Sequence, residues 1–447
     1  MKSSALILNI FFFFFFLTFL HYFITTSNAT TTPSFPKEAL PTKTGYLPIN
    51  STSKSAMFYA YYEAQQPISP LPQTPILIWL QGGPGCSSMI GNFYELGPWR
   101  VTSSAVLKPN PGAWNNLFGL LFIDNPIGTG FSIAETREEI PKDQETVGKH
   151  LFIAIRKFVA LNPSFKSRPI YITGQSYAGK FVPAIGYYIL QQNSRLRLSQ
   201  HVNLMGVAIG NGFTDPITQV TTHAETAYYI GLINEKQRVQ LEEFQSEAVK
   251  LVQEGKWSNA THARTKVLST LANMTGLATI NDYRRTKPYN TGLVREFLAN
   301  EEIKKALGFP ISINWRRCSG AVRAALHEDA MKSVKFMVEK LLQKTKVLLY
   351  QGQYDLRDGI VSTEAWINTL KWEGLEKFLN AERKVWKIEG KVPGYVQRWG
   401  NLSEVLVSGA GHFVPADQAV SSQAMIQDWV LERGLFDDKR RDYVAKL

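Results

Sequence analysis

The chain has 447 residues, of which 44% are hydrophobic and 19% are charged, and its formal net charge is +12. This length and composition argue against a disordered chain and against one small core. They predict one large α/β domain with an insertion, or two to three domains. The basic residues are spread along the chain rather than gathered in a stripe, so nucleic-acid binding is not expected.

The N-terminus carries a targeting pattern. One lysine precedes a long apolar run rich in Phe, and small polar residues ending in "SNA" follow. This pattern predicts a secretory signal peptide over residues 1–29, cleaved after Ala29. A retained signal anchor is the alternative, but His21 and Thr25 interrupt the run before it reaches the roughly 20 apolar residues that span a bilayer. No stable membrane association is therefore expected after cleavage.

Glycosylation signals agree with secretion. Four N-glycosylation sequons begin at Asn50, Asn259, Asn273 and Asn401. The final tripeptide "AKL" is similar to a peroxisomal address, but an N-terminal signal acts first, so we interpret it as a chance match. The expected location is the secretory pathway, with the extracellular space or cell wall and the vacuole both open.

The only two cysteines are Cys86 and Cys318. An even number in an oxidising compartment allows one disulfide. Such a bond would close a loop of about half the chain, which the chain-entropy model equates with about 5 kcal/mol of stabilisation. Two buried free thiols are the alternative.

Short apolar runs predict the strands of a buried sheet. They cover residues 75–81, 119–125, 169–174, 203–210, 346–350 and 404–409. Their continuous apolar character is typical of a mainly parallel sheet covered on both faces. Helical patterns separate the runs, as at 145–161 and from Ala178 onward, and this alternation predicts an α/β fold.

The middle of the chain differs from its two ends. Residues 215–343 are polar and rich in helix-forming sequence. We interpret them as a helical cap inserted between two parts of an α/β core, residues 30–214 and 344–447.

Ser176 is a candidate nucleophile. It follows the strand-like "YITG" and precedes a helical pattern, with Gly174, Ala178 and Gly179 around it. A strained strand-to-helix turn that exposes a serine needs such small neighbours. The strict G-x-S-x-G form is not met because Ala178 holds the second small position, so an ordinary loop serine is the alternative.

A serine nucleophile needs a base and an acid. Among seven histidines, His412 lies in a Gly-rich loop after the last predicted strand, where α/β-hydrolases place theirs in the order Ser, acid, His. Asp355 directly follows the strand at 346–350, and Asp358 competes with it. We favour Asp355 because active sites of open α/β sheets gather at strand ends. His412 would take the serine proton, and Asp355 would orient the imidazole.

Oxyanion donors can also be anticipated. The backbone N–H of Tyr177 directly follows the candidate nucleophile, and the Gly-rich loop "WLQGGPGCSS" at 79–88 follows an earlier strand. This arrangement fits a pair of backbone donors for a tetrahedral intermediate.

The motifs together resemble those of the serine carboxypeptidase family. The matching stretches include "LIWLQGGPGCSSMIGNFYELGP", "TGQSYAGKFVPAI", "AIGNGFTDP", "GQYDLRDG" and "GAGHFVPADQ", in family order over nearly all the predicted mature chain. Within the family, the chain is similar to the vitellogenic-like and retinoid-inducible branch and to the plant serine carboxypeptidase-like proteins. The resemblance implies an α/β-hydrolase fold, the triad Ser176, Asp355 and His412, oxyanion donors at Gly83 and Tyr177, and a Cys86–Cys318 disulfide. It implies no cofactor and no metal.

The resemblance also implies a site for the free C-terminal carboxylate of a peptide. Trp79 and Glu95 match the family pattern, and Gly82 belongs to the same loop. Gln81 stands where the family has Asn, and Gln175 stands where it has Glu. Both replacements keep a hydrogen-bond donor.

The leading hypothesis is a secreted serine-type carboxypeptidase that hydrolyses the C-terminal bond of a peptide through an acyl-enzyme. A carboxypeptidase-like acyltransferase that uses acyl-sugar donors is the alternative, because it would use the same triad. A binding or scaffold protein on a hydrolase fold is a third hypothesis, and the complete triad argues against it.

Overall fold

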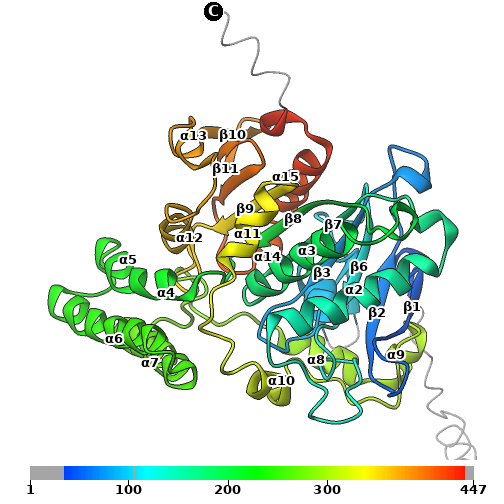
Figure 1. The fold of residues 1–447 in the computed structure, drawn as a ribbon, viewed down its shortest axis with the longest axis horizontal. Helices are drawn as coiled ribbons and strands as arrows, with labels where there is room; N and C mark the ends of the chain where they lie inside the picture. The colour runs from blue at the N-terminus through cyan, green and yellow to red at the C-terminus, as the bar shows by residue number, and fades with distance from the viewer. Residues whose placement is uncertain (1–34, 104–105, 438–447) are drawn as a thin grey trace, which may run out of the picture.

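The computed structural model describes residues 35–103 and 106–437, which leaves the predicted signal peptide (1–29) outside the described part (Figure 1). A ten-stranded mixed sheet runs through the molecule in the order β1-β2-β6-β3-β7-β8-β9-β12-β11-β10, and β4 and β5 form a separate hairpin. The strands are β1 (Lys43–Pro48), β2 (Ala56–Tyr62), β3 (Ile76–Leu80), β4 (Trp99–Ser103), β5 (Val106–Pro109), β6 (Gly119–Ile123), β7 (Ile170–Gln175), β8 (Leu204–Gly210), β9 (Lys346–Gly352), β10 (Lys384–Ile388), β11 (Lys391–Trp399) and β12 (Leu402–Val407).

The strands from β6 to β12 in this order pair in parallel and form the centre of the sheet. Every residue of β3, β6 and β7 is buried. Their continuous apolar sequence therefore reflects cover on both faces, and the predicted mainly parallel α/β sheet is confirmed. The antiparallel strands at the two ends of the sheet were not predicted. β10 and β11 are only partly buried and carry no continuous apolar run, whereas β2 is apolar and buried throughout.

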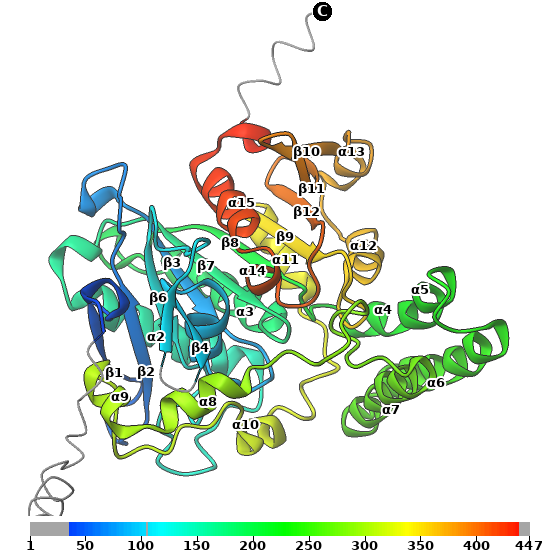
Figure 2. The same ribbon diagram turned by 180° about the vertical axis from the view of Figure 1, so that it is seen from behind.

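Helices cover the two faces of the sheet. Those on one face are α2 (Gln144–Ala160), α3 (Ala178–Asn193) and α11 (Lys335–Leu342), seen in front of the strands in Figure 1. The opposite face carries α14 (Val414–Asp417), α15 (Ala419–Leu431) and the π-helical turn η3 (Gly91–Leu96), as Figure 2 shows. Alternation along β3 divides its side chains between two apolar clusters. Ile78 faces the cluster that includes α2 and α3, and Trp79 faces the one that includes α15.

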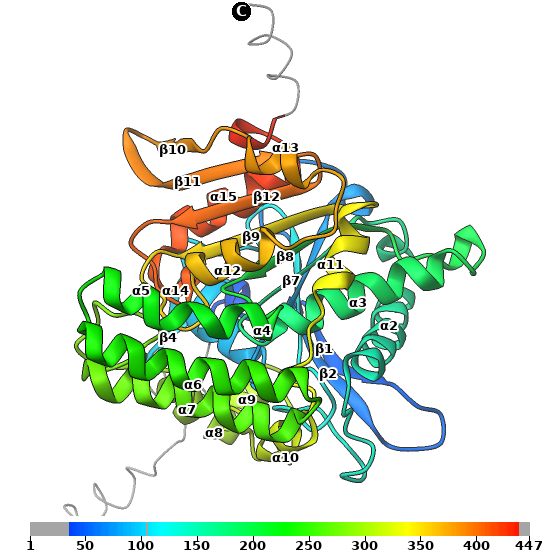
Figure 3. The same cartoon turned by 60° about the vertical axis from the view of Figure 1, so that its left-hand side comes forward.

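A helical insertion lies between β8 and β9. It contains α4 (Pro216–Gln219), α5 (His223–Tyr229), α6 (Glu235–Gln253), α7 (Trp257–Thr275), α8 (Gly292–Ala299), α9 (Glu301–Ala306) and α10 (Gly320–Ala325). The α6–α7 pair projects to one side of the sheet (Figure 3) and shares a small apolar cluster with α5. We keep 215–343 as the proposed cap. This range also includes α11, which packs against α3 and β9 and so covers the sheet rather than the insertion.

The remaining elements are short. They are α12 (Ile360–Ile367), α13 (Leu375–Leu379), η1 (Lys37–Ala39), η2 (Leu71–Gln73), η4 (Pro163–Phe165), η5 (Leu198–Gln200), η6 (Val220–Thr222) and η7 (Gly434–Phe436). Across the described ranges, no helix has the length and apolarity needed to cross a bilayer.

A disulfide joins the insertion to the core. Cys86, in the loop after β3, is bonded to Cys318, just before α10. Two backbone hydrogen bonds flank it, from Ser87 N to Arg317 O (2.9 Å) and from Ser319 N to Gly85 O (2.8 Å). The Gly-rich loop and the start of α10 are therefore tied to each other by one covalent bond and two backbone hydrogen bonds.

Candidate active site

Ser176 lies on the sharp turn between β7 and α3. Its φ of 61° is in the left-handed region, which costs a non-glycine residue about 1–2 kcal/mol. The surrounding backbone holds this conformation, because Ser176 N donates to Gly210 O (3.0 Å) and Ser176 O accepts from Gly179 N (2.8 Å). A Cβ on Gly174 would lie 2.6 Å from Leu80 O. The small neighbours seen in the sequence are therefore required by close backbone contact.

His412 lies in the loop after β12 and pairs with Asp355. Its Nδ1 is 2.7 Å from Asp355 Oδ2, and both side chains are buried. The imidazole lines the same cavity as Ser176. The structure thus brings together the three residues predicted from separate motifs.

Asp355 is held in place by other donors. Its Oδ2 also accepts from Asn211 Nδ2 (2.8 Å), and its Oδ1 accepts from the backbone N of Arg357 (2.8 Å). Sequence reasoning gave no role to Asn211. Its place at the end of β8, within the motif "AIGNG", was the available signal.

Asp358, the alternative acid, has different partners. Its Oδ1 lies 3.3 Å from Arg264 Nη2 and its Oδ2 lies 3.4 Å from Arg357 Nε. The carboxylate that hydrogen-bonds His412 is that of Asp355.

The protonation of His412 reflects two opposing effects. Burial lowers the pKa of the imidazole, whereas the charge of Asp355 and the hydrogen bond to it raise this pKa. The net result is a pKa above the ordinary value. Asp355 thus stabilises the imidazolium, which is the protonation state that a base reaches after taking a proton.

The Gly-rich loop after β3 lies directly against the serine turn. A Cβ on Gly82 would be 2.6 Å from Tyr177 N and 2.8 Å from Ser176 Cβ. Gly83 has a φ of +119°, which a side chain would strain. Glycine is therefore needed for this loop to bring its backbone beside Ser176 and Tyr177.

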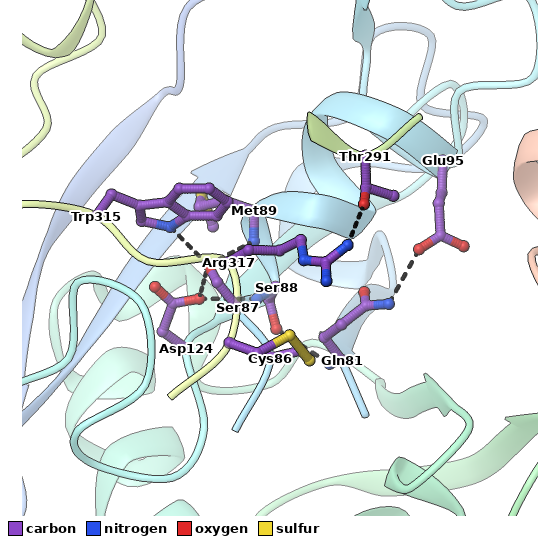
Figure 4. The surroundings of a disulfide bond; sticks show 11 residues. Gln81, Cys86, Ser87, Ser88, Met89, Glu95, Asp124, Thr291, Trp315 and Arg317 are labelled. Carbon is purple, nitrogen blue, oxygen red and sulfur yellow. Dashed lines mark hydrogen bonds between the residues drawn. A yellow bond between two sulfur atoms is a disulfide. The ribbon is translucent and has the colours of Figure 1, made fainter. Parts of the chain in front are cut away.

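A cluster of buried polar side chains lies beside this loop. Gln81 Nε2 donates to Glu95 Oε1 (3.1 Å), and Gln175 Nε2 donates to the same oxygen (3.0 Å). Trp79 Nε1 in turn donates to Gln81 Oε1 (2.8 Å). Figure 4 shows the Gln81–Glu95 contact next to the disulfide. The four residues predicted from the family pattern are thus in mutual contact, and both glutamines line the cavity that contains Ser176.

Burial raises the pKa of the Glu95 carboxyl to about 8, although the hydrogen bond from Gln81 and the charge of His412 lower it. Glu95 is therefore mainly protonated at neutral pH. Its Oε1 accepts from both amides, while its Oε2 has no partner among the described residues. The proton is accordingly best placed on Oε2, which makes that atom a donor.

The sequon asparagines differ in exposure. Asn50, Asn259 and Asn273 are exposed. Asn401 is half-buried, and its Nδ2 donates to Leu342 O (2.8 Å). Three of the four predicted sites are therefore accessible to a glycan, and the use of all four stays a prediction.

The fold is that of an α/β hydrolase. Such proteins have a mainly parallel sheet, a serine on a strand-to-helix turn and a His–Asp pair after later strands, as found here. Comparison with known proteins gives the family. The model of the serine carboxypeptidase family matches residues 33–432. The chain belongs to this family and is a hydrolase of the serine carboxypeptidase type.

Its relatives agree with this assignment. The chain is 59% identical to serine carboxypeptidase-like 50 of Arabidopsis thaliana, with 91% of each chain covered. It is 33% identical to the probable serine carboxypeptidase CPVL of Homo sapiens, with 90% of this chain and 85% of that protein covered. The solved structure of Kex1Δp, a prohormone-processing carboxypeptidase from Saccharomyces cerevisiae, superposes with a TM-score of 0.80 at 25% identity, covering 89% of this chain and 92% of that one. The predicted resemblance to plant and vitellogenic-like members is confirmed.

Replacing the two candidate acids should separate their roles. Asp355→Asn is expected to lower kcat on an N-blocked dipeptide by about 10³–10⁴-fold, because the imidazole loses its orienting carboxylate. Asp358→Asn should keep kcat within about one order of magnitude, because Asp358 does not hydrogen-bond His412. Equal losses in the two variants would contradict this assignment.

The need for glycine at position 82, where the loop lies against the backbone of Tyr177, can also be tested. Gly82→Ala is expected to lower kcat by about 10²–10³-fold, because its Cβ would displace the loop from Tyr177 N. Gly320→Ala is the matched control, since a Cβ there meets no atom within 4 Å. Thermal unfolding of both variants would show whether the loss at Gly82 reflects the site or the fold. Full activity of Gly82→Ala would refute the requirement.

Proposed function

We propose that this protein is a serine carboxypeptidase that removes the C-terminal residue of a peptide through an acyl-enzyme intermediate. One observation carries the proposal. Ser176, His412 and the two amides of Gln81 and Gln175 line a single cavity, so a nucleophile and a carboxylate-binding group lie within reach of one bound peptide end.

The proposed reaction uses each of these residues in turn. Ser176 Oγ attacks the carbonyl carbon of the last peptide bond, and His412 Nε2 accepts the hydroxyl proton. Asp355 keeps the proton of the ring on Nδ1 and stabilises the imidazolium. His412 then donates its proton to the leaving amine, the C–N bond breaks, and an ester to Ser176 remains. Water, activated by the same imidazole, hydrolyses this ester.

The negative charge that develops on the carbonyl oxygen needs fixed donors. The backbone N–H groups of Gly83 and Tyr177 are our candidates, because the Gly-rich loop and the serine turn are in backbone contact. Such preorganised donors act without reorganisation during the reaction.

The peptide's free carboxylate would bind the buried polar cluster. Gln81 and Gln175 each have a second amide hydrogen besides the one given to Glu95, and protonated Glu95 adds a hydroxyl donor. Trp79 and Gly82 support this cluster, Trp79 through its bond to Gln81 and Gly82 by its place in the loop. Recognition would thus rest on neutral donors rather than on a buried cation.

Secretion is part of the proposal. A disulfide is typical of proteins that mature in an oxidising compartment, and the predicted signal peptide and sequons agree with it. The substrates would accordingly be peptides of the cell wall, extracellular space or vacuole.

The activity can be tested with purified protein, N-blocked dipeptides and acyl-glucose donors, each assayed beside Ser176→Ala. We expect release of the C-terminal amino acid from the peptides, with loss of at least about 10³-fold in the variant. Acyl transfer without peptide cleavage would replace the proposal by the acyltransferase alternative. Absence of any turnover that depends on Ser176 would refute both and favour a scaffold protein.

Gln175 should set the pH dependence of substrate binding. In the wild type, KM should stay nearly constant from about pH 5 to 7 and rise above about pH 8, where Glu95 loses its proton and repels the substrate carboxylate. Gln175→Glu places a second carboxyl beside Glu95, so one proton is lost at lower pH and KM should already rise between acidic and neutral pH.

The control is Gln175→Leu, which removes the donor and should raise KM across the whole range. If the wild type and Gln175→Glu weaken alike toward neutral pH, the role of Gln175 is wrong.

A further inference from the structure

The cleft around Ser176 is strongly basic. Besides the cavity that holds the two glutamines, a second cavity is also lined by Ser176 and shares Gly83, Arg323 and Arg357 with the first. The charged residues that line the two cavities, apart from histidines, are Arg264, Arg317, Arg323, Arg357 and Asp358. The lining of the two cavities therefore contains four arginines and one acidic residue, Asp358.

The two cavities have different places relative to the scissile bond. Gln81 and Gln175 line only the first cavity, so it would take the C-terminal residue that leaves. The second cavity is lined by Tyr177, Phe213 and Leu268 and lacks these amides. It would take the side chain of the residue that becomes the acyl group, which is the penultimate residue of the peptide.

Arg264, on α7, forms part of the wall of this second cavity. Its guanidinium lies over the Phe213 ring at 3.8 Å from the centroid, and its side chain is only 12% exposed. Its Nε has no hydrogen-bond partner among the described residues. A buried cation with an unused donor is stabilised when an anion enters the site.

The single negative charge of Asp358 does not cancel the positive charge of the arginines that line this cavity. Its distances to Arg264 (3.3 Å) and Arg357 (3.4 Å) both exceed the 2.7–2.9 Å of a well-formed charge-assisted hydrogen bond. It also divides its single charge between two arginines. Arg323 is exposed and has no ion pair in the described part of the chain. The lining of this cavity therefore keeps an excess of positive charge.

The basic character continues outside the cleft. A surface groove that shares Arg317 and Arg323 with it is also lined by Arg295 and Arg316, against one acidic residue, Glu296. Figure 4 shows Arg317 beside Cys86, with its guanidinium directed at Thr291. The disulfide places this arginine-rich segment next to the Gly-rich loop. A groove of one sign of charge raises the local concentration of oppositely charged ligands.

We propose that the cleft selects acidic peptides, with Asp or Glu at the penultimate position held by Arg264, Arg323 and Arg357. This inference rests on the proposed carboxypeptidase function and assigns its substrate class. The side-chain carboxylate would approach the exposed guanidinium of Arg323, with the positive charges of Arg264 and Arg357 in the same cavity wall, while the peptide carbonyl lies at Ser176. A lysine or arginine at the same position would be repelled.

The test compares N-blocked dipeptides that share a C-terminal leucine and carry Glu, Gln, Leu or Lys before it. At low ionic strength, kcat/KM for the Glu peptide should exceed that for the nearly isosteric Gln peptide by about 10- to 100-fold, with Lys the poorest. The preference should shrink when salt shortens the range of the charges. Equal values for Glu and Gln, with both cleaved, would overturn the inference while leaving the carboxypeptidase function standing.

Variants identify the groups responsible. Arg264→Gln and Arg323→Gln should each lower the Glu-to-Gln ratio several-fold. Arg323 is exposed and without an ion pair, so its substitution tests the idea even if Arg264→Gln fails to fold. Arg197→Gln removes the same charge from an exposed position that lines neither cavity, and it should leave the ratio unchanged. A ratio unchanged in both cleft variants would overturn the assignment.

Binding to Ser176→Ala gives a readout independent of turnover. The Glu peptide should bind this protein more tightly than the Gln peptide in calorimetry. If the peptides are cleaved with no preference for Glu, the result contradicts only the inference about acidic substrates. No cleavage that depends on Ser176 contradicts the proposed function, and the inference falls with it.

Discussion

The close approach of two backbone turns is the constraint on which the site depends. The Gly-rich loop after β3 meets the Ser176 turn at a distance where a Cβ on Gly82 would lie 2.6 Å from Tyr177 N. The parallel pairing of β3 with β7 sets this approach, because it brings both strand ends to the same edge of the sheet. The strained conformation of Ser176 and the placement of the proposed oxyanion donors follow from it.

The helical insertion completes the site from the opposite side. The segment after α7 hydrogen-bonds to both catalytic loops, through Asn281 O to His412 N (2.7 Å) and Ile280 O to Leu356 N (3.0 Å). The disulfide adds a covalent link from the Gly-rich loop to the segment before α10. The same contacts that hold the loops also bring Arg264, Arg317 and Arg323 to the cleft. The proposed selection of the substrate would therefore depend on the same contacts that hold these loops in place.

Charge is divided across the site in a simple way. The floor that would receive the α-carboxylate is built from neutral donors, since burial keeps Glu95 protonated near neutral pH. The walls carry the arginines. A cation at the buried floor would cost more in desolvation than an exposed one such as Arg323. In the proposed function, the neutral donors would bind the α-carboxylate of any peptide, and the arginines would distinguish one peptide from another.

The sequence by itself determined the elements whose signals are local. Continuous apolar runs marked the central parallel strands, and the small residues around Ser176 marked the nucleophile turn, because close packing forces those residue types. The loop of His412 was likewise visible as a Gly-rich segment after a strand. Only the tertiary structure shows which of Asp355 and Asp358, three positions apart in the sequence, hydrogen-bonds the imidazole, since this depends on the direction of each carboxylate. It also revealed Asn211 and gathered arginines from α7, α10 and the loop after β9. Their common position results from long-range packing and a disulfide, which no local pattern in the chain records.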